Sequence, residues 1–207
     1  MNRTKRESVL IACEYSGRVR DAMQRVRPDL NVISCDILPS EGDVDGKHIQ
    51  GDLLDVLGSR QWEAIIGFPP CTHLAVSGAR YFADKRTDGR QREAIEFVKA
   101  IWDSADKVAI ENPVGILNSY EQWPELRGIG LDLPRPQYIQ PWQFGQGTQK
   151  KTGLWIKGFA PLVPTDIVEG RRQEVWLMGP SADRAKKRSI TPQGIADAMA
   201  EQWGKLI

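Results

Sequence analysis

Short apolar runs alternate with amphipathic stretches over the first half of the chain. The apolar runs are brief and rich in Val and Ile, as buried strands are, and they cover residues 9–12, 31–36, 64–66 and 107–110. Residues 90–104 instead place Ile95, Val98 and Trp102 at helical spacing. This alternation predicts an α/β fold, with helices wound on both faces of a mostly parallel sheet.

The second half of the chain is less regular. Pro, Gly and Trp are frequent from residue 117 to 141, which predicts an irregular excursion without a core of its own. Thr191 and Pro192 predict the N-cap and first residue of a closing helix. With 207 residues, of which 41% are hydrophobic, we expect residues 1–207 to form one domain with a substantial core. Four aromatic residues are expected to pack in this core or at its edge: Trp142, Phe144, Trp155 and Trp176.

The stretch Pro69-Pro70-Cys71 directly follows an apolar strand. Two prolines fix the backbone there and present a thiol where open α/β sheets bind their ligands, at the carboxyl end of a strand. Such preorganisation suits a nucleophile. A buried structural cysteine would fit this segment equally well.

A second strand ends in Glu111-Asn112-Pro113. Because the ends of parallel strands meet along one edge, Glu111 is expected to lie beside the Pro69–Cys71 loop. A carboxyl group near a thiol is a plausible acid/base partner in covalent catalysis. The alternative is a capping or loop carboxylate, but the pairing with Cys71 favours function.

Two earlier strand ends are candidates for cofactor contacts. Residues 12–17 predict a strand, a tight turn at Gly17 and a helix start whose N–H groups could approach a polar cofactor. Asp36 ends the next strand, where nucleotide-binding folds place a carboxylate on ribose hydroxyls. Taken alone, each of these features would also fit an ordinary turn.

In chain order, these motifs resemble those of the DNA cytosine-5-methyltransferases. Pro70-Cys71 and Glu111-Asn112 are similar to that family's catalytic Pro-Cys and Glu-Asn motifs. The resemblance implies a Rossmann-like fold that binds S-adenosylmethionine. Cys71 would add to carbon 6 of cytosine, Glu111 would hold or protonate ring nitrogen 3, and carbon 5 would take the methyl group. Thr72 and Pro113 depart from the family, which usually has Gln and Val there.

The resemblance also assigns contacts residue by residue. Asp52 matches the position that reads the adenine amino group, and Lys151 falls on the first Arg of a Gln-x-Arg-x-Arg motif. The implied catalytic residues are Cys71, Glu111 and Asn112. The implied cofactor contacts are Ala12, Cys13, Glu14, Gly17, Asp36, Ile37, Asp52, Leu53 and Pro69. The implied substrate contacts are Pro70, Thr72, Arg80 and Lys151.

The expected partner is nucleic acid, with DNA first. Family members that read duplex DNA usually carry a large target-recognition region, but this chain has only a short segment between Lys157 and Arg188. Its basic residues suit phosphate contacts: Arg171, Arg172, Arg184, Lys186, Lys187 and Arg188. The net charge of +1 gives no general attraction to nucleic acid. The same chemistry on a free pyrimidine nucleotide or RNA is therefore the alternative. A non-catalytic nucleotide- or cofactor-binding protein is the third reading, favoured by the single Gly17.

Cysteine and histidine usage predicts the compartment. Cys13, Cys35 and Cys71 have no paired spacing, and the chain has 2 histidines, so we expect no metal site and a reducing, cytoplasmic location. No apolar run reaches the roughly 20 residues that a bilayer crossing needs, and no membrane partner is expected.

Overall fold

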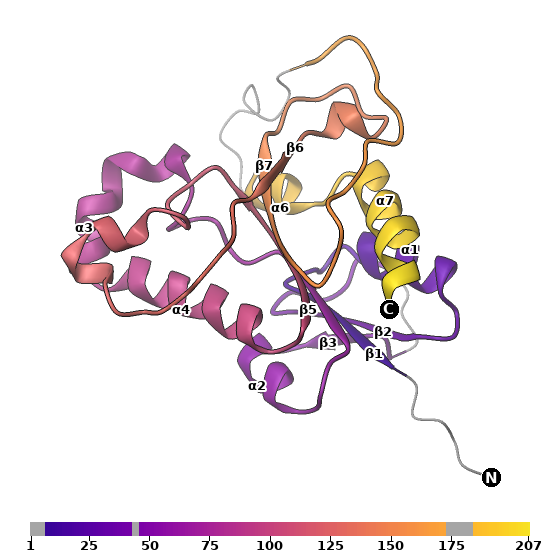
Figure 1. Ribbon diagram of the computed structural model, residues 1–207, viewed down its shortest axis with the longest axis horizontal. Coiled ribbons are helices and arrows are strands. Elements are labelled where there is room, and N and C mark those ends of the chain that lie inside the picture. Colours follow the sequence, from indigo (N-terminus) through magenta and orange to yellow (C-terminus); the bar gives the residue numbers. More distant parts are fainter. Residues whose placement is uncertain (1–6, 43–45, 173–183) are drawn as a thin grey trace.

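A computed structural model describes residues 7–42, 46–172 and 184–207 of the chain (Figure 1). In this part of the chain, seven strands form one sheet in the order β3-β2-β1-β4-β5-β7-β6. The strands are β1 (Ser8–Ala12), β2 (Asn31–Asp36), β3 (His48–Gln50), β4 (Ala64–Gly67), β5 (Lys107–Pro113), β6 (Gln137–Ile139) and β7 (Thr152–Lys157). β1 to β5 run parallel, whereas β7 runs antiparallel to both β5 and β6. The predicted doubly wound, mostly parallel Rossmann-like sheet is confirmed.

The strands β1, β2, β4, β5 and β7 bury side chains on both faces of the sheet. On β1, Leu10 and Ala12 face one core, while Val9 and Ile11 face the other. The helices that cover the first face are α2 (Leu53–Gly58), α3 (Phe82–Thr87) and α4 (Arg90–Asp103), and those on the second are α1 (Arg18–Val26) and α7 (Gln193–Trp203). A further short helix is α6 (Arg184–Ser189). Because both faces are buried, the strands read as continuous apolar runs.

The strand order places a topological switch between β1 and β4. From β1 the chain moves outward through β2 and β3, then returns to add β4 and β5 on the other side. At such a point the connections leave the carboxyl edge in opposite directions and open a crevice for ligands. Cys13 and Phe68, the residues after these two strands, therefore mark the expected position of a ligand.

The segment 117–141 is less irregular than its composition predicts. It contains two short 3₁₀ helices, η2 (Tyr120–Gln122) and η3 (Pro124–Leu126), and then the edge strand β6. Leu126, Ile129 and Leu131 are buried in the core on the α4 face. The excursion thus contributes to the main core. That residues 1–207 form a single domain stays a prediction.

The closing helix starts later than predicted. α7 begins at Gln193, its N-cap is Pro192, and Thr191 is buried instead of capping the helix. The physical reason is that the Pro192 carbonyl already accepts Ile195 N at 3.0 Å and Ala196 N at 3.1 Å. Trp176 lies outside the described residues, as do the side chains of Arg184 and Lys187, so the expectations for them stay predictions.

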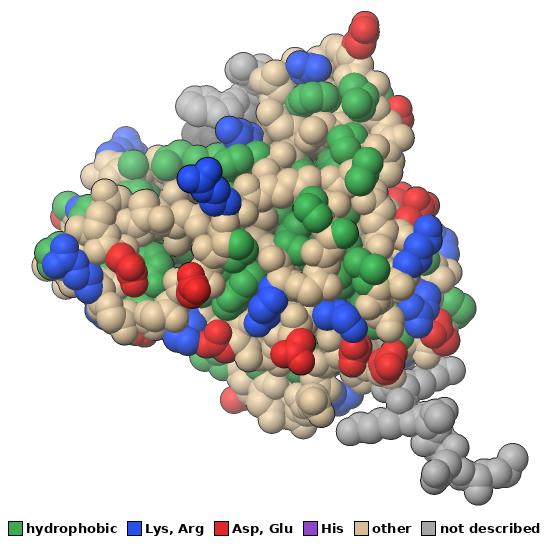
Figure 2. Space-filling view, viewed as in Figure 1, with side chains coloured by type: hydrophobic (Ala, Val, Ile, Leu, Met, Phe, Trp, Pro, Cys, Tyr) green, Lys and Arg blue, Asp and Glu red, His purple; other side chains and the backbone are tan. Residues whose placement is uncertain are grey.

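The surface carries both signs of charge. On the face in Figure 2, Lys and Arg side chains are interspersed with Asp and Glu along the lower right edge, in keeping with the net charge of +1. Within the three described ranges, no helix combines the length and apolar character that a membrane crossing requires.

Candidate active site

The Pro69–Cys71 loop leaves the sheet at the carboxyl end of β4. Pro69 is buried, whereas Pro70, Cys71 and Thr72 are exposed. The Cys71 carbonyl accepts two backbone N–H groups, from Leu74 at 3.0 Å and Ala75 at 2.9 Å. These bonds close a tight turn directly after the cysteine. The thiol therefore stands at the surface on a fixed turn, where the sequence placed it.

Asn112 joins this loop to the end of β5. β4 and β5 are parallel neighbours with Gly67 paired to Ile110, so their carboxyl ends lie side by side. The Asn112 side chain is buried, and its Nδ2 donates to the Pro69 carbonyl at 2.9 Å. The Asn112 amide thus turns inward to the loop backbone and holds it. That Asn112 takes part in catalysis stays a prediction.

Gly115 brings the two loops into direct backbone contact. Val76 N donates to Val114 O at 3.0 Å, and Ile116 N donates to Leu74 O at 3.1 Å, on either side of an isolated bridge between residues 75 and 115. A Cβ atom on Gly115 would lie 2.2 Å from the Leu74 carbonyl oxygen. Only glycine allows this approach. Sequence reasoning missed its role, although a glycine four residues after the carboxylate was a visible signal.

Glu111 lies on the same edge as Cys71, held from β7. Its carboxylate accepts a hydrogen bond from Thr152 Oγ1 at 2.5 Å, and Lys150 Nζ lies 3.9 Å from Oε1. The Glu111 side chain is 15% exposed, so it is shielded but reachable. β7 runs antiparallel to β5 and pairs Thr152 with Pro113, which brings the start of β7 over the carboxylate.

The cation beside Glu111 is Lys150 and not Lys151. Lys151 is exposed, with Nζ 4.3 Å from the centre of the Tyr138 ring. Lys150 Nζ also donates to the Arg188 carbonyl at 3.0 Å, which ties the α6 segment to the site. The two adjacent lysines thus have different partners, and the contact of Lys151 is with Tyr138 and not with Glu111.

The charges around Cys71 act in opposite directions. Although Cys71 is exposed as a residue, partial desolvation and the nearby Glu111 carboxylate raise the pKa of its thiol, while Lys150 and Arg188 lower it. The net effect is a pKa above the ordinary value for cysteine. The thiol is therefore protonated near neutral pH, and it must lose its proton when it attacks. That Cys71 and Glu111 act as a pair stays a prediction.

Carboxylates line the edge on the other side of the switch point. Asp36 ends β2 and accepts Leu38 N at 2.9 Å; burial raises its pKa. Asp52 is the N-cap of α2 and accepts Leu54 N at 2.9 Å. Ile37, which follows Asp36, is 76% exposed. Acceptor carboxylates next to exposed apolar surface suit a nucleoside, with its hydroxyl and amino donors and its flat base.

Several residues expected to contact a cofactor have buried side chains. Ala12 is fully buried, and its carbonyl accepts Phe68 N at 2.9 Å. Leu53 packs in the core, and the buried Pro69 gives its carbonyl to Asn112. These side chains are packed inside the protein, so a cofactor contact from these three residues would have to come from the backbone; it stays a prediction. Cys13 is partly exposed at the crevice in a left-handed conformation with φ of 57°.

Glu14 and Gly17 also have structural roles. The buried Glu14 carboxylate accepts Val19 N at 2.6 Å and Arg20 N at 3.2 Å, so it occupies the N–H groups at the start of α1. Burial raises the pKa of Glu14 to about 7. Gly17 has φ of 73°, and a Cβ there would lie 2.3 Å from Arg20 Nη2. The expectation that these N–H groups are free for a cofactor is wrong, because an internal carboxylate already binds them.

Two basic residues that follow Cys71, Arg80 and Lys85, differ in exposure. The Arg80 guanidinium stacks on the Tyr81 ring at 4.5 Å and is exposed, so it stays a candidate substrate contact together with Pro70 and Thr72. Lys85 is buried and turned toward the loop. Among the described residues, no group of three or more His, Cys, Asp or Glu side chains could hold a metal ion.

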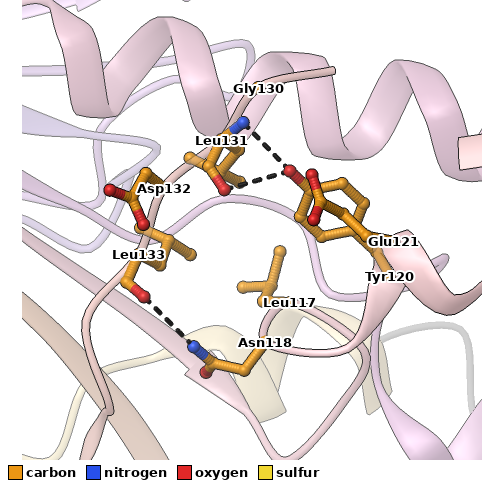
Figure 3. Close-up of a pocket in the computed structure, with 8 residues that line it drawn as sticks. All are labelled: Leu117, Asn118, Tyr120, Glu121, Gly130, Leu131, Asp132 and Leu133. Carbon is orange, nitrogen blue, oxygen red and sulfur yellow. Dashed lines mark hydrogen bonds between the residues drawn. The ribbon is translucent and has the colours of Figure 1, made fainter. Parts of the chain in front are cut away.

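A cavity of about 360 Å³ lies in the 117–141 excursion, apart from Cys71 and Glu111 (Figure 3). Its walls are fixed by hydrogen bonds. Tyr120 Oη donates to the Leu131 carbonyl and accepts Leu131 N, both at 3.0 Å, and Asn118 Nδ2 donates to the Leu133 carbonyl. The dashed lines in Figure 3 mark these contacts between the lining residues.

Comparisons with known proteins place these observations in context. No protein-family model matches the chain, and no curated protein matches its sequence. Solved structures do match. One is described as a candidate DNA modification methyltransferase encoded within an E. coli prophage, with 16% identity, 84% of this chain and 55% of that chain covered, and a TM-score of 0.47.

Two eukaryotic structures also match. The Entamoeba histolytica methyltransferase EhMeth has 12% identity, 86% and 62% coverage of this and that chain, and a TM-score of 0.47. The Spodoptera frugiperda Dnmt2 has 13% identity, 80% and 55% coverage, and a TM-score of 0.43. The chain spans between 55% and 62% of the length of these three matched structures. All three are described as methyltransferases or carry the name Dnmt2, and this chain is similar to them.

Proposed function

We propose that this protein is an S-adenosylmethionine-dependent methyltransferase that acts on carbon 5 of cytosine in DNA through a covalent Cys71 adduct. One observation carries the proposal: the Asn112–Pro69 hydrogen bond joins the Pro69–Cys71 loop to the carboxyl end of β5, the strand that carries Glu111. The order of the Pro-Cys and Glu-Asn motifs, which resemble those of the cytosine-5-methyltransferases, supports it.

The chemistry follows from these side chains. Carbon 5 of cytosine is a poor nucleophile while the ring is aromatic. Attack of the Cys71 sulfur on carbon 6 breaks the aromaticity and pushes electrons toward carbon 5 and nitrogen 3. Glu111, placed by Thr152 and Lys150, donates a proton or hydrogen bond to nitrogen 3 and so stabilises that charge. Once carbon 5 has taken the methyl group, loss of the carbon 5 proton and release of the Cys71 sulfur restore the aromatic ring.

The residues at the carboxyl ends of β1, β2 and β3 fit a methyl donor that carries a nucleoside. Asp36 and Asp52 offer carboxylate acceptors, and Ile37 offers an exposed apolar surface. When bound there, S-adenosylmethionine would supply the methyl group. Cys13, beside the switch point, would border the same crevice.

Cofactor binding can be tested by a pair of matched variants. Asp52→Asn keeps an N-cap side chain, because Asn caps helices as well as Asp does, but it removes the carboxylate charge. Asp55→Asn makes the same change at an exposed position on α2. Calorimetric titration should show cofactor binding weakened about tenfold or more in Asp52→Asn only, as expected for a lost hydrogen bond to a charged group. Equal affinities in the two variants would remove Asp52 from the site.

The covalent step can be tested with a fluorinated substrate. DNA that carries 5-fluorocytosine should form a stable adduct with the native protein, because fluorine cannot leave as the proton does. Peptide mapping should find the adduct on Cys71. Cys71→Ser should lose the adduct and keep cofactor binding, whereas Ser77→Ala, at an exposed position a few residues later, should keep both. An adduct on Cys13 or Cys35 would contradict the assignment.

The same chemistry on RNA or on a free pyrimidine nucleotide is the second candidate. The short chain segment between β7 and α6 favours it, since little surface is left to read a duplex. A base in a duplex must also leave its stack, at a cost of a few kcal/mol that protein contacts must offset. Radiolabelled cofactor should be incubated with duplex DNA, single-stranded DNA, RNA and nucleotides in parallel. No methyl transfer to any pool would favour a non-catalytic binding protein.

A further inference from the structure

Two buried polar side chains lie behind the loop that carries Cys71. Lys85, on α3, is 6% exposed, and its Nζ donates to the Thr72 carbonyl at 2.6 Å. Gln91, on α4, is fully buried, and its Nε2 donates to the His73 carbonyl at 2.9 Å. Two different helices thus bind the two carbonyls that directly follow the cysteine.

A buried lysine of this kind is costly. Lys side chains are rarely buried without a charged partner, because water solvates the ammonium group far better than protein does. Among the described residues, no carboxylate forms an ion pair with Lys85. Space for the ammonium is left by Gly78, where a Cβ would lie 3.3 Å from Nζ. An apolar residue would fill this position at lower cost, so the ammonium needs another explanation.

The hydrogen bonds from Lys85 and Gln91 add to others that hold the backbone on both sides of Cys71. Asn112 holds the Pro69 carbonyl on one side of Cys71, and Lys85 and Gln91 hold the next two carbonyls on the other side. The Cys71 carbonyl is itself held by two backbone N–H groups. The peptide groups on the carboxyl side of Cys71 therefore cannot rotate without breaking a hydrogen bond in the loop's support. Burial, together with the charges of Lys85 and Arg90, also lowers the pKa of His73, in keeping with a cation close under the loop.

We propose that Lys85 and Gln91 are positioning residues for the Cys71 nucleophile, which keep its loop in the attacking geometry before substrate arrives. Neither side chain touches the substrate in this role. The inference rests on the proposed function, because it assigns the loop a purpose in methyl transfer. Its physical content, a loop fixed by two side-chain donors, can be measured without any substrate.

The test compares Lys85→Met and Gln91→Met, which remove each donor at similar volume, with two control variants. Lys99→Met makes the same change at a partly exposed lysine on α4 that pairs with Asp103. Lys85→Arg keeps a cationic donor. Backbone hydrogen exchange of residues 71–76 should accelerate at least tenfold in both donor-deleting variants, with little change in the strands. It should stay near native in Lys99→Met and Lys85→Arg.

Single-turnover methyl transfer is the second measurement. A displaced nucleophile should slow the reaction by roughly 10²-fold, while the affinity for S-adenosylmethionine changes less than twofold. Lys85→Arg should recover at least a tenth of the native rate. If native protein methylates no substrate, the proposed function fails, but the exchange experiment still decides whether the two side chains hold the loop.

Two results would overturn the inference. One is that residues 71–76 exchange no faster in Lys85→Met and Gln91→Met than they do in Lys99→Met. The other is exchange that accelerates equally over the whole chain, since that would mean a general contribution to stability. If Lys85→Met does not fold, Gln91→Met decides alone, because Gln91 is uncharged and its replacement removes a single hydrogen bond.

Discussion

Gly115→Ala should displace the loop that carries Cys71 without changing the side chain of Cys71 or Glu111. The added Cβ would lie 2.2 Å from Leu74 O, 2.9 Å from Leu74 C and 3.2 Å from Ala75 Cα. All three are backbone atoms, so no side chain can swing away to make room. Gly115 is not in the left-handed region of φ, so alanine brings no conformational strain of its own. The whole effect comes from the collision.

The size of the displacement follows from these distances. Ordinary contacts begin at 3.4 Å, so the Leu74 carbonyl must retreat by at least about 1.2 Å from its 2.2 Å position. That movement breaks the Ile116 N–Leu74 O hydrogen bond of 3.1 Å. Overpacking costs about 1–3 kcal/mol and a lost hydrogen bond about 1 kcal/mol, so we expect the free energy of unfolding to fall by roughly 2–4 kcal/mol. A shift of about 1 Å at the loop should slow methyl transfer by roughly 10²-fold.

Urea unfolding and single-turnover methyl transfer measure the two effects. Gly58→Ala is the matched control, because a Cβ there meets no atom within 4 Å and the residue ends α2. The control should keep the native rate and gain a few tenths of a kcal/mol or more in stability. The reasoning would be refuted if Gly115→Ala kept its methyl-transfer rate within threefold of native and its free energy of unfolding within about 0.5 kcal/mol of native, which is the effect of an ordinary surface substitution. That result would mean that the two loops are not in contact.

Two further predictions concern the carboxylates. Glu111→Gln keeps a hydrogen-bond donor but cannot transfer a proton, so substrate should bind nearly as well while single-turnover methyl transfer slows by roughly 10²–10⁴-fold; a rate within a few-fold of native would mean that Glu111 is structural. Burial raises the pKa of Glu14 from 4.5 to about 7. Between these two pH values the folded state holds a proton on Glu14 that the unfolded state has lost, so the free energy of unfolding falls as pH rises through this range. Chemical unfolding at a series of pH values should show a loss of about 3 kcal/mol across that range from this group, a slope that Glu14→Gln abolishes; an unchanged slope in the variant would assign the proton to another residue.

The sequence by itself determined the sheet and the edge of the sheet on which Cys71 and Glu111 lie. Apolar runs bounded by Pro, Gly and acidic residues locate the strands, because a strand buried on both faces must be apolar throughout. Parallel strands align their carboxyl ends, so the residues that follow β4 and β5 had to share one edge. Cys71 and Glu111 could therefore be brought together from their local patterns alone.

Only the tertiary structure decided which neighbours support that pair. Asn112 turns inward, Lys150 faces Glu111 in place of Lys151, and Glu14 binds the helix N–H groups expected to be free. Lys85 is buried, and its ammonium group binds the loop backbone at Thr72. These outcomes depend on contacts between segments 13 or more residues apart, except for the local cap at Glu14. A local pattern fixes the type of element a residue belongs to, whereas the side to which its polar group turns is set by the packing of the elements against one another.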